Sequence, residues 1–263
     1  MKKEVSIILI LFLIFISCSQ NPEVKTMQNS TQLKNTIIID AYDNEEFNPK
    51  FKTGFGFGAV VKAYNKNILF DTGGDAPILL TNLKTAGIKT SDIDIIVLSH
   101  IHNDHVGGLK GFLEKNSNVQ VYVPVSFPSS FKKDITSTGA EVIEITNSVK
   151  IIDGVYSTGE LGTTIKEQSL ILDTDKGLII ISGCAHPGIV HIVKTAKKLI
   201  KKPVYLVMGG FHHPPISIVK EFKKLGVKKV APSHCTGNDA IKAFAEEYKN
   251  DFIKSGVGKI IEI

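Results

Sequence analysis

The sequence predicts a layered α/β sandwich in which helices cover two packed sheets. From Thr36 onward, short β-rich runs alternate with runs of helical spacing, and a longer β-rich stretch fills the middle of the 263-residue chain. Helical runs lie on both sides of that stretch. The content of 43% hydrophobic and 22% charged residues is ordinary for a globular protein. We therefore expect one domain at residues 36–263, preceded by an N-terminal tail.

Strands are expected in the first half where β-branched and other apolar residues cluster between turn residues. These runs are Ile37–Ile39, Ala59–Val61, Asn67–Phe70 and Ile93–Leu98. Pro77–Ala86 has the spacing of a helix, with apolar Leu79 and Leu83 on one face, and it ends before Gly87. Gly107–Leu113 is expected to be the start of a helix or a loop.

The middle and the second half continue the alternation of strands and helices. The middle strands are expected at Val119–Val123, Glu141–Ile145, Val149–Tyr156, Ser169–Leu172 and Leu178–Ser182. Helical spacing follows at Ile189–Ile200, Ile216–Leu225 and Asp239–Lys249. The remaining strands are expected at Val204–Met208, Lys229–Ala231 and Ile260–Ile263.

The N-terminus has the pattern of an export signal. Two lysines follow Met1, and the apolar run Val5–Ile16 is too short to span a membrane comfortably but fits the core of a signal peptide. The run ends in Phe15-Ile16-Ser17-Cys18, which resembles a bacterial lipoprotein signal, although Phe15 stands where Leu is usual.

This resemblance implies a signal peptide at residues 1–17, a lipid on Cys18 and a flexible tether at residues 18–35, which are rich in Asn, Gln, Ser and Thr. It implies a lipoprotein that is anchored in the membrane and faces the periplasm or the cell exterior. An uncleaved anchor and a plain export signal are the alternatives, and both also export the protein or tether it to a membrane.

The net charge is +5, and loss of residues 1–17 would remove two lysines and one glutamate, which leaves +4. The lysines concentrate in two sets on expected helices or their ends: Lys194, Lys197, Lys198, Lys201, Lys202 and Lys220, Lys223, Lys224, Lys228, Lys229. A solvated face explains both sets, and attraction to anionic lipid or an anionic substrate is the alternative. Aromatic and basic residues do not interleave, so we expect no nucleic-acid partner. The expected partner is a small-molecule substrate.

The segment Ser99–His105 carries the strongest chemical signal. It places three imidazoles and one carboxylate within six residues, directly after the buried strand expected at Ile93–Leu98. Such a strand end directs several ligand atoms at one point, and neutral imidazole with carboxylate suits zinc, iron or manganese. A solvated His-rich turn is the alternative, but matching candidates recur at later strand ends.

The other candidates follow the expected strands one by one. Asp71 stands shortly before two glycines. It either belongs to a simple turn or accepts a hydrogen bond that orients a ligating imidazole. The later motifs are Gly183-Cys184-Ala185-His186-Pro187-Gly188, Gly209-Gly210-Phe211-His212-His213 and Ser233-His234-Cys235-Thr236-Gly237.

Taken together, these motifs resemble the metallo-β-lactamase superfamily. Leu69-Phe70-Asp71-Thr72-Gly73 stands ahead of Leu98–His105 and Gly107-Gly108-Leu109, as in that superfamily. The later motifs are similar to its dihydropteroate-synthase-like metallo-hydrolase branch, some archaeal members of which are named for making a dihydropterin–aminobenzene ribofuranosyl phosphate. The resemblance covers residues 36–263 and implies a four-layered αββα sandwich with a metal centre between the sheet edges.

The resemblance also implies a ligand set for two divalent metal ions, with zinc expected and iron or manganese as alternatives. His100 and His102 would bind the first ion, Asp104 and His105 would bind the second, and His234 is the closing histidine of the set. No histidine lies between His105 and His186, so His186 would replace the usual third ligand of the first ion. Cys184 stands where a bridging Asp is expected, as a thiolate ligand or as a small buried apolar residue.

Several residues keep more than one interpretation. Glu167 is expected to be a ligand, a partner of a ligand or a surface carboxylate, and Glu160 lies in the same region. His212 is expected near the site, and His213 in a loop without a chemical role. A disulfide between Cys184 and Cys235 and a role for each at the site are both open.

The predicted activity is metal-assisted hydrolysis of an ester, lactone or phosphoester. Bound metal ions lower the pKa of water from about 15.7 to about 7, and the hydroxide would attack the substrate. Asp104 would orient this nucleophile, and His212 would protonate the leaving group or bind an anionic part of the substrate. A β-lactamase is less expected, because β-lactamases with a cysteine ligand usually lack the second His of Asp104-His105.

Two further interpretations come from different classes of protein. One is a synthase-like transferase of the archaeal type, although its cytosolic substrates fit poorly with predicted export. The other is a metal-binding surface module without catalytic turnover.

Overall fold

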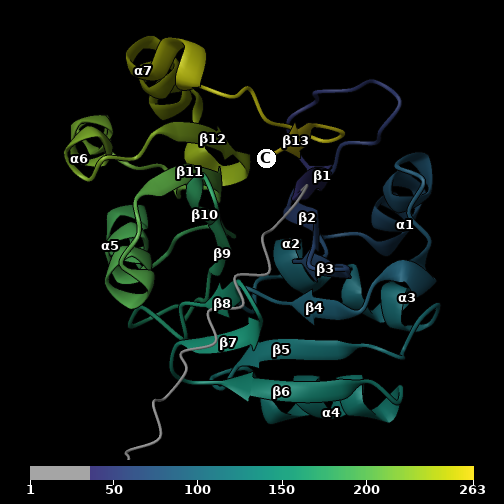
Figure 1. Cartoon of the computed structure of the whole chain (residues 1–263). Coiled ribbons are helices and arrows are strands. Elements are labelled where there is room, and N and C mark those ends of the chain that lie inside the picture. The colour runs from purple at the N-terminus through teal and green to yellow at the C-terminus, as the bar shows by residue number, and fades with distance from the viewer. Residues whose placement is uncertain (1–35) are drawn as a thin grey trace, which may run out of the picture. The chain divides into compact units, whose positions relative to one another are not determined.

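The computed structural model describes residues 36–263, so the predicted signal peptide, Cys18 and the tether lie outside the described residues. In the described part, two sheets pack face to face and helices cover their outer faces (Figure 1). This arrangement confirms the predicted four-layered αββα sandwich. No helix among residues 36–263 is both long enough and apolar enough to cross a membrane.

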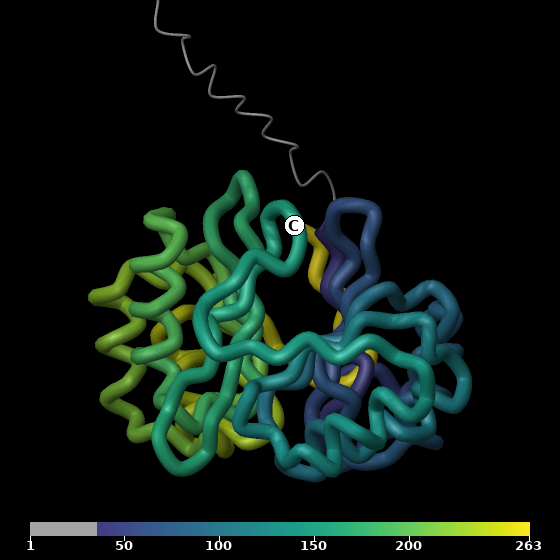
Figure 2. The backbone as a smooth tube through the Cα atoms, turned by 90° about the horizontal axis from the view of Figure 1, so that it is seen from below, coloured from purple at the N-terminus to yellow at the C-terminus, as the bar shows by residue number. Residues whose placement is uncertain are grey.

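The first sheet has seven strands in the order β13–β1–β2–β3–β4–β5–β6. Their bounds are β1 Ile37–Asp43, β2 Phe57–Ala63, β3 Lys66–Phe70, β4 Ile95–Val97, β5 Gln120–Pro124, β6 Glu141–Ile145 and β13 Ile260–Glu262. Strands β3 to β6 run parallel, so their carboxyl ends lie at one edge. Figure 2 shows the yellow C-terminal strand beside purple β1, with which it pairs.

The second sheet has six strands in the order β12–β11–β10–β9–β8–β7. Their bounds are β7 Val149–Ile152, β8 Val155–Ser157, β9 Leu170–Thr174, β10 Gly177–Ser182, β11 Val204–Gly210 and β12 Lys229–Ser233. Strands β10, β11 and β12 run parallel, which again brings their carboxyl ends to one edge.

The helices divide between the two sheets (Figure 1). The first half contains α1 Ala76–Thr85, α2 Asn103–Val106, α3 Leu109–Leu113, α4 Ser129–Ser137 and the 3₁₀ turn η1 Thr90–Asp92. The second half contains α5 Ile189–Ile200, α6 Ile218–Lys224, α7 Asn238–Tyr248 and the 3₁₀ turns η2 His234–Thr236 and η3 Lys249–Asp251.

Three apolar cores hold the layers together. Because successive residues of a strand face opposite sides of the sheet, Ile68 and Phe70 of β3 enter the core between the sheets. Leu69 instead packs with Leu79 and Leu83 of α1 on the outer face. A third core joins the second sheet to α5, α6 and α7. Burial on both faces explains the nearly continuous apolar runs of the parallel strands.

One expected strand was wrong, and one helix was not expected. Val149–Tyr156 is not one strand but the hairpin β7–β8, which turns at Asp153-Gly154. Gly154 has a φ of 74°, the left-handed conformation that an Asp-Gly hairpin turn uses. Helix α4 was not expected, because only Phe131 and Ile135 give it an apolar face.

Candidate metal centre

The candidate site residues lie in loops that follow the carboxyl ends of parallel strands. These residues are Asp71 after β3, Ser99–His105 after β4, Cys184 and His186 after β10, His212 after β11, and His234 and Cys235 after β12. The two sheets present these strand ends to one another, so side chains far apart in sequence meet.

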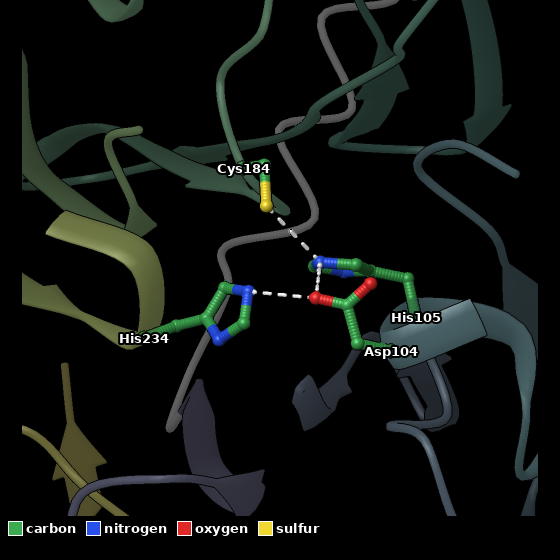
Figure 3. A group of neighbouring side chains, drawn as sticks. All are labelled: Asp104, His105, Cys184 and His234. Carbon is green, nitrogen blue, oxygen red and sulfur yellow. Dashed lines mark hydrogen bonds and ion pairs between the residues drawn. The ribbon is translucent and has the colours of Figure 1, made fainter. Parts of the chain in front are cut away.

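Four of these residues form what we call the inner group: Asp104, His105, Cys184 and His234 (Figure 3). One ligand atom from each lies within 4.8 Å of all the others. Nε2 of His105 is 3.2 Å from Sγ of Cys184, and Nε2 of His234 is 3.3 Å from Oδ2 of Asp104. His105, Cys184 and His234 are buried, and the side chain of Asp104 is partly exposed.

Three histidines form what we call the outer group: His100, His102 and His186. Nε2 of His100 lies 3.2 Å from Nδ1 of His102, and the rings of His102 and His186 are 4.9 Å apart. Ligand atoms of His100 and His186 also lie within 4.8 Å of one another and of the Cys184 sulfur. Cys184 is therefore the residue that the two groups share.

Asp71 supports the inner group as an acceptor, which is the contact predicted from the sequence. Its fully buried carboxylate accepts from the Ser99 N–H at 2.6 Å and the Ser99 hydroxyl at 2.7 Å, and lies 2.7 Å from Nδ1 of His105. The Ser99 oxygen is also 2.8 Å from Nδ1 of His100. Since the Ser99 proton goes to Asp71, His100 donates from Nδ1 and keeps the Nε2 lone pair for a ligand.

Glu167 supports the outer group and is not a surface carboxylate. It is buried, and it accepts from the backbone N–H groups of Cys184, Ala185 and His186 at 2.8–3.0 Å. Its Oε2 also lies 2.9 Å from Nδ1 of His186, which leaves Nε2 of that ring free. Of the three predicted roles, the partner of a ligand is the one that this geometry fits.

Asn44 and Ser99 were not identified from the sequence. Oδ1 of Asn44 lies 2.8 Å from Nδ1 of His234, across 190 positions of the chain. No local motif signals this contact, because only the fold brings the loop after β1 to β12. Ser99 lies inside the His motif, but that motif predicted roles only for its histidines and for Asp104.

Electrostatics favour a cation at this centre. Burial lowers the pKa of His100 to about 2, so its imidazole is neutral and able to ligate. Burial alone would also lower the pKa of His105, but the carboxylates of Asp71 and Asp104 raise it to about 10. In the metal-free protein His105 is therefore charged, and a divalent ion would replace that proton.

The residues present fit a divalent metal. Nε2 of His234 is buried and makes no hydrogen bond, although Oδ2 of Asp104 lies 3.3 Å away in poor alignment. A buried polar atom without a partner costs about 1–3 kcal/mol, which a metal ligand bond would offset. Zinc bonds of 2.0–2.1 Å in a tetrahedron separate two ligand nitrogens by about 3.3 Å, close to the spacing of His100 and His102.

The remaining candidates lie at the margin of these groups. His212 is exposed, its ring is 4.4 Å from that of His186, and it lies within 4.8 Å of Cys184 and Cys235. His213 is exposed and belongs to no ligand group among the described residues. Glu160 lies elsewhere and accepts from the Ser126 N–H.

Cys184 and Cys235 are free thiols, with their sulfur atoms 3.2 Å apart. This separation is well beyond the length of about 2.05 Å of a disulfide. Both cysteines lie at the site, and no disulfide joins them in the structure.

Backbone strain concentrates around the same loops. Five non-glycine residues here have positive φ angles of 45–63°: Asp71, Ala185, His212, His213 and His234. Such angles are uncommon outside glycine and persist where the surrounding structure holds them. Because strained backbone is typical of functional sites, these angles favour a functional role for the strand ends.

The fold and the cluster together define an αββα sandwich with a group of candidate metal ligands at the edge where the strand ends meet. The family described as the metallo-β-lactamase superfamily matches residues 54–198. The chain belongs to the metallo-β-lactamase superfamily.

Relatives in sequence and structure refine this assignment. The chain is 34% identical to the 7,8-dihydropterin-6-methyl-4-(β-D-ribofuranosyl)-aminobenzene-5'-phosphate synthase of Methanocaldococcus jannaschii, over 86% of this chain and 96% of that protein. The crystal structure of Tm1679, described as a metal-dependent hydrolase of the β-lactamase superfamily, matches with a TM-score of 0.74 and 25% identity over 87% of this chain and 99% of Tm1679. YhfI from Bacillus subtilis shares the fold, with a TM-score of 0.63 at 12% identity over 87% and 99% of the two chains.

Proposed function

We propose that this protein is a metal-dependent transferase similar to the dihydropterin–ribofuranosylaminobenzene phosphate synthase, rather than the hydrolase expected first. The observation that carries the proposal is the extent of the match, which covers 86% of this chain and 96% of the synthase. The proposed reaction joins an aromatic amine to an activated pterin-like carbon. A carbon–nitrogen bond forms, the bond from that carbon to its leaving group breaks, and the amine loses a proton.

The thiol of Cys184 between the two ligand groups supports transfer over hydrolysis. When bound, divalent ions would act as Lewis acids toward the oxygen of a leaving group. A thiolate is a softer and stronger electron donor than the carboxylate usual at this position, so it would weaken the acidification of water. Water would then compete less well with an amine for the activated carbon.

His212 is the residue best placed to move a proton. It is exposed to incoming substrate, and its ring lies 4.4 Å from that of His186. Partial burial and the neighbouring His186 lower the pKa of His212, which keeps the imidazole neutral near pH 7. A neutral imidazole can accept the proton that the attacking amine releases.

Phe55 supports a planar aromatic substrate. The residue is 69% exposed, and its ring centre lies 5.3 Å from that of His234. The next residue, Gly56, packs against the backbone of Asp104 so closely that a Cβ atom would lie 2.2 Å from the carbonyl oxygen. This contact fixes the loop beside the ligands, and an exposed aromatic ring there offers a stacking surface.

The direct test mixes zinc-loaded protein with an aromatic amine and a 6-hydroxymethyl-dihydropterin activated as a phosphate or diphosphate ester. Mass spectrometry of a joined product, formed only with both partners and enzyme, would support the transferase. Hydrolysis of the activated pterin at the same rate with and without amine would contradict it.

Hydrolysis remains the second candidate, because Tm1679 is described as a metal-dependent hydrolase and shares the fold with a TM-score of 0.74. A panel of phosphodiester, lactone and thioester substrates tests this candidate. Metal-loaded protein that turns over neither the panel nor the pterin pair would instead support a metal-binding surface module.

We also propose the membrane location that the N-terminal signal suggests, with lipid on Cys18, which requires that the substrates of the transferase be available outside the cytoplasm. Cell fractionation of the parent and of Cys18→Ala tests it. The parent is expected in the membrane fraction, and equal distribution of the two would contradict the anchor.

A further inference from the structure

We propose that Cys184 and Cys235 are a modification site, at which a reversible disulfide competes with metal binding. The two free sulfur atoms are 3.2 Å apart, and Sγ of Cys235 also lies 3.7 Å from the carbonyl oxygen of Cys184. Formation of a disulfide bond of about 2.05 Å requires the sulfurs to approach by only about 1 Å.

The strand between the two cysteines leaves space for their sulfur atoms to meet. Cys184 follows β10 and Cys235 follows β12, while β11 lies between them and ends at Gly210. A Cβ atom on Gly210 would lie 2.7 Å from the Cys235 sulfur, so any larger residue would obstruct it. Residues 36–263 contain no other cysteine, so within the described part each thiol has one partner.

The two thiols differ in their access to solvent. Cys184 is buried, with 4% exposure, whereas Cys235 is half-buried. A small oxidant therefore reaches Cys235 first, and Cys184 is in position to resolve the oxidised sulfur.

Hydrogen peroxide is the oxidant class that we propose, and the reaction balances in two steps. The Cys235 sulfur attacks a peroxide oxygen, the O–O bond breaks, and sulfenic acid and one water form. The Cys184 sulfur then attacks the Cys235 sulfur, the S–O bond breaks, and the disulfide and a second water form. A dithiol reverses the bond by exchange and becomes a disulfide itself.

The consequence follows from the shared position of Cys184. Its sulfur belongs to the inner group, to the set with His100 and His186, and to the set with His212 and Cys235. Metal ions bind a deprotonated thiolate, and a disulfide removes that ligand from every set at once. Oxidation and metal binding therefore exclude one another at this sulfur.

This inference rests on the proposed metal centre but not on which reaction the centre performs. The pairing itself is measured by thiol content and mass, whereas its effect on the site is measured by zinc binding. A failure of the transferase assay would leave both readouts intact.

The test uses the full chain carrying Cys18→Ser, so that only the two cysteines of the site remain. Metal-free protein is treated with a small excess of peroxide, and free thiols, intact mass and zinc affinity are measured. We expect loss of both thiols, a mass decrease of about 2 Da from the two lost hydrogens and recovery with dithiothreitol. The oxidised chain is expected to bind zinc at least about 10-fold more weakly, and prior zinc loading should slow the oxidation.

Cys235→Ser in the same background is the matched control. It should gain oxygen mass on oxidation instead of losing hydrogen, because Cys184 then has no partner thiol. Persistent thiols, oxygen adducts on both cysteines of the parent, or disulfides between chains would overturn the proposal. Equal loss of zinc in Cys235→Ser and Cys184→Ser would also overturn it, because Cys235 would then be a ligand.

Discussion

The inner and outer ligand groups share Cys184, but a different carboxylate supports each. Asp71 accepts from one backbone N–H and from the side chains of Ser99 and His105. Glu167 accepts from His186 and from three successive backbone N–H groups. Asp71 therefore mainly orients ligands, whereas Glu167 also builds the loop that carries them. The comparison predicts that loss of Asp71 affects metal binding most and loss of Glu167 affects folding most.

The largest effect is expected from removal of an inner ligand. His234→Ala deletes the Nε2 atom that is buried without a hydrogen-bond partner, so one metal ion should be lost and activity should fall by about 10³-fold or more. Elemental analysis and steady-state rates check this. His213→Ala is the matched control, since His213 is exposed and outside the ligand groups, and it should keep its metal. Full metal content in His234→Ala would remove His234 from the site.

The next effect concerns the support of the inner group. Asp71→Asn keeps the size of the side chain but removes the charge that faces His105, so zinc affinity should fall about 10- to 100-fold. Competition with a chromophoric chelator measures the affinity, and a thermal melt of the metal-free protein shows whether folding is spared. A large loss of stability with unchanged affinity would reverse the roles assigned to Asp71 and Glu167.

Glu167→Gln should mainly reduce stability. Its amide cannot accept all the bonds that the carboxylate accepts, and the unsatisfied buried groups should cost about 1–3 kcal/mol. Urea unfolding of the metal-free variant and parent at neutral pH measures the difference.

The same residue predicts a dependence on pH. Burial alone would raise the pKa of Glu167, but the hydrogen bonds from His186 and the backbone lower it from its ordinary 4.5 to about 2. A lowered folded-state pKa gives stability that is complete above 4.5 and is lost as the pH falls toward 2. Unfolding of metal-free parent between these pH values should show this loss, and Glu167→Gln should show less of it. Identical slopes for the two proteins would contradict the contribution of Glu167.

The smallest effect is expected at the mouth of the site. Phe55→Ala should raise KM for an aromatic substrate about 2- to 10-fold and leave kcat and metal content unchanged, because only stacking is lost. Phe55→Trp should retain the affinity, and Phe55→Leu tests whether apolar contact alone is enough. A fall in kcat without a change in KM would mean that the ring acts on the chemistry and not on binding.

The sequence predicted the residues of the His100–His105 motif more directly than it predicted the ligands that follow later strands. His100 to His105 lie in one short motif, so their shared location follows from local spacing alone. His186 and His234 required the resemblance to a family, because their strands meet that motif only in the folded chain. The contact of Asn44 with His234 spans 190 positions and has no local pattern, so only the structure reveals it.

The fold shows the same division between strong and weak local patterns. Helix α5 matches its expected bounds because its apolar residues repeat at helical spacing. Helix α4 was missed because it buries little, with Ile135 as its one buried residue.

Crystals of the zinc-loaded protein, measured at the zinc absorption edge, would test the central claim most directly. The account predicts two anomalous peaks on either side of the Cys184 sulfur. One peak should lie within about 2.3 Å of the ligand nitrogens of His105 and His234, and the other within that distance of the outer histidines. A single peak distant from Cys184, or no peak between His105 and His234, would contradict it.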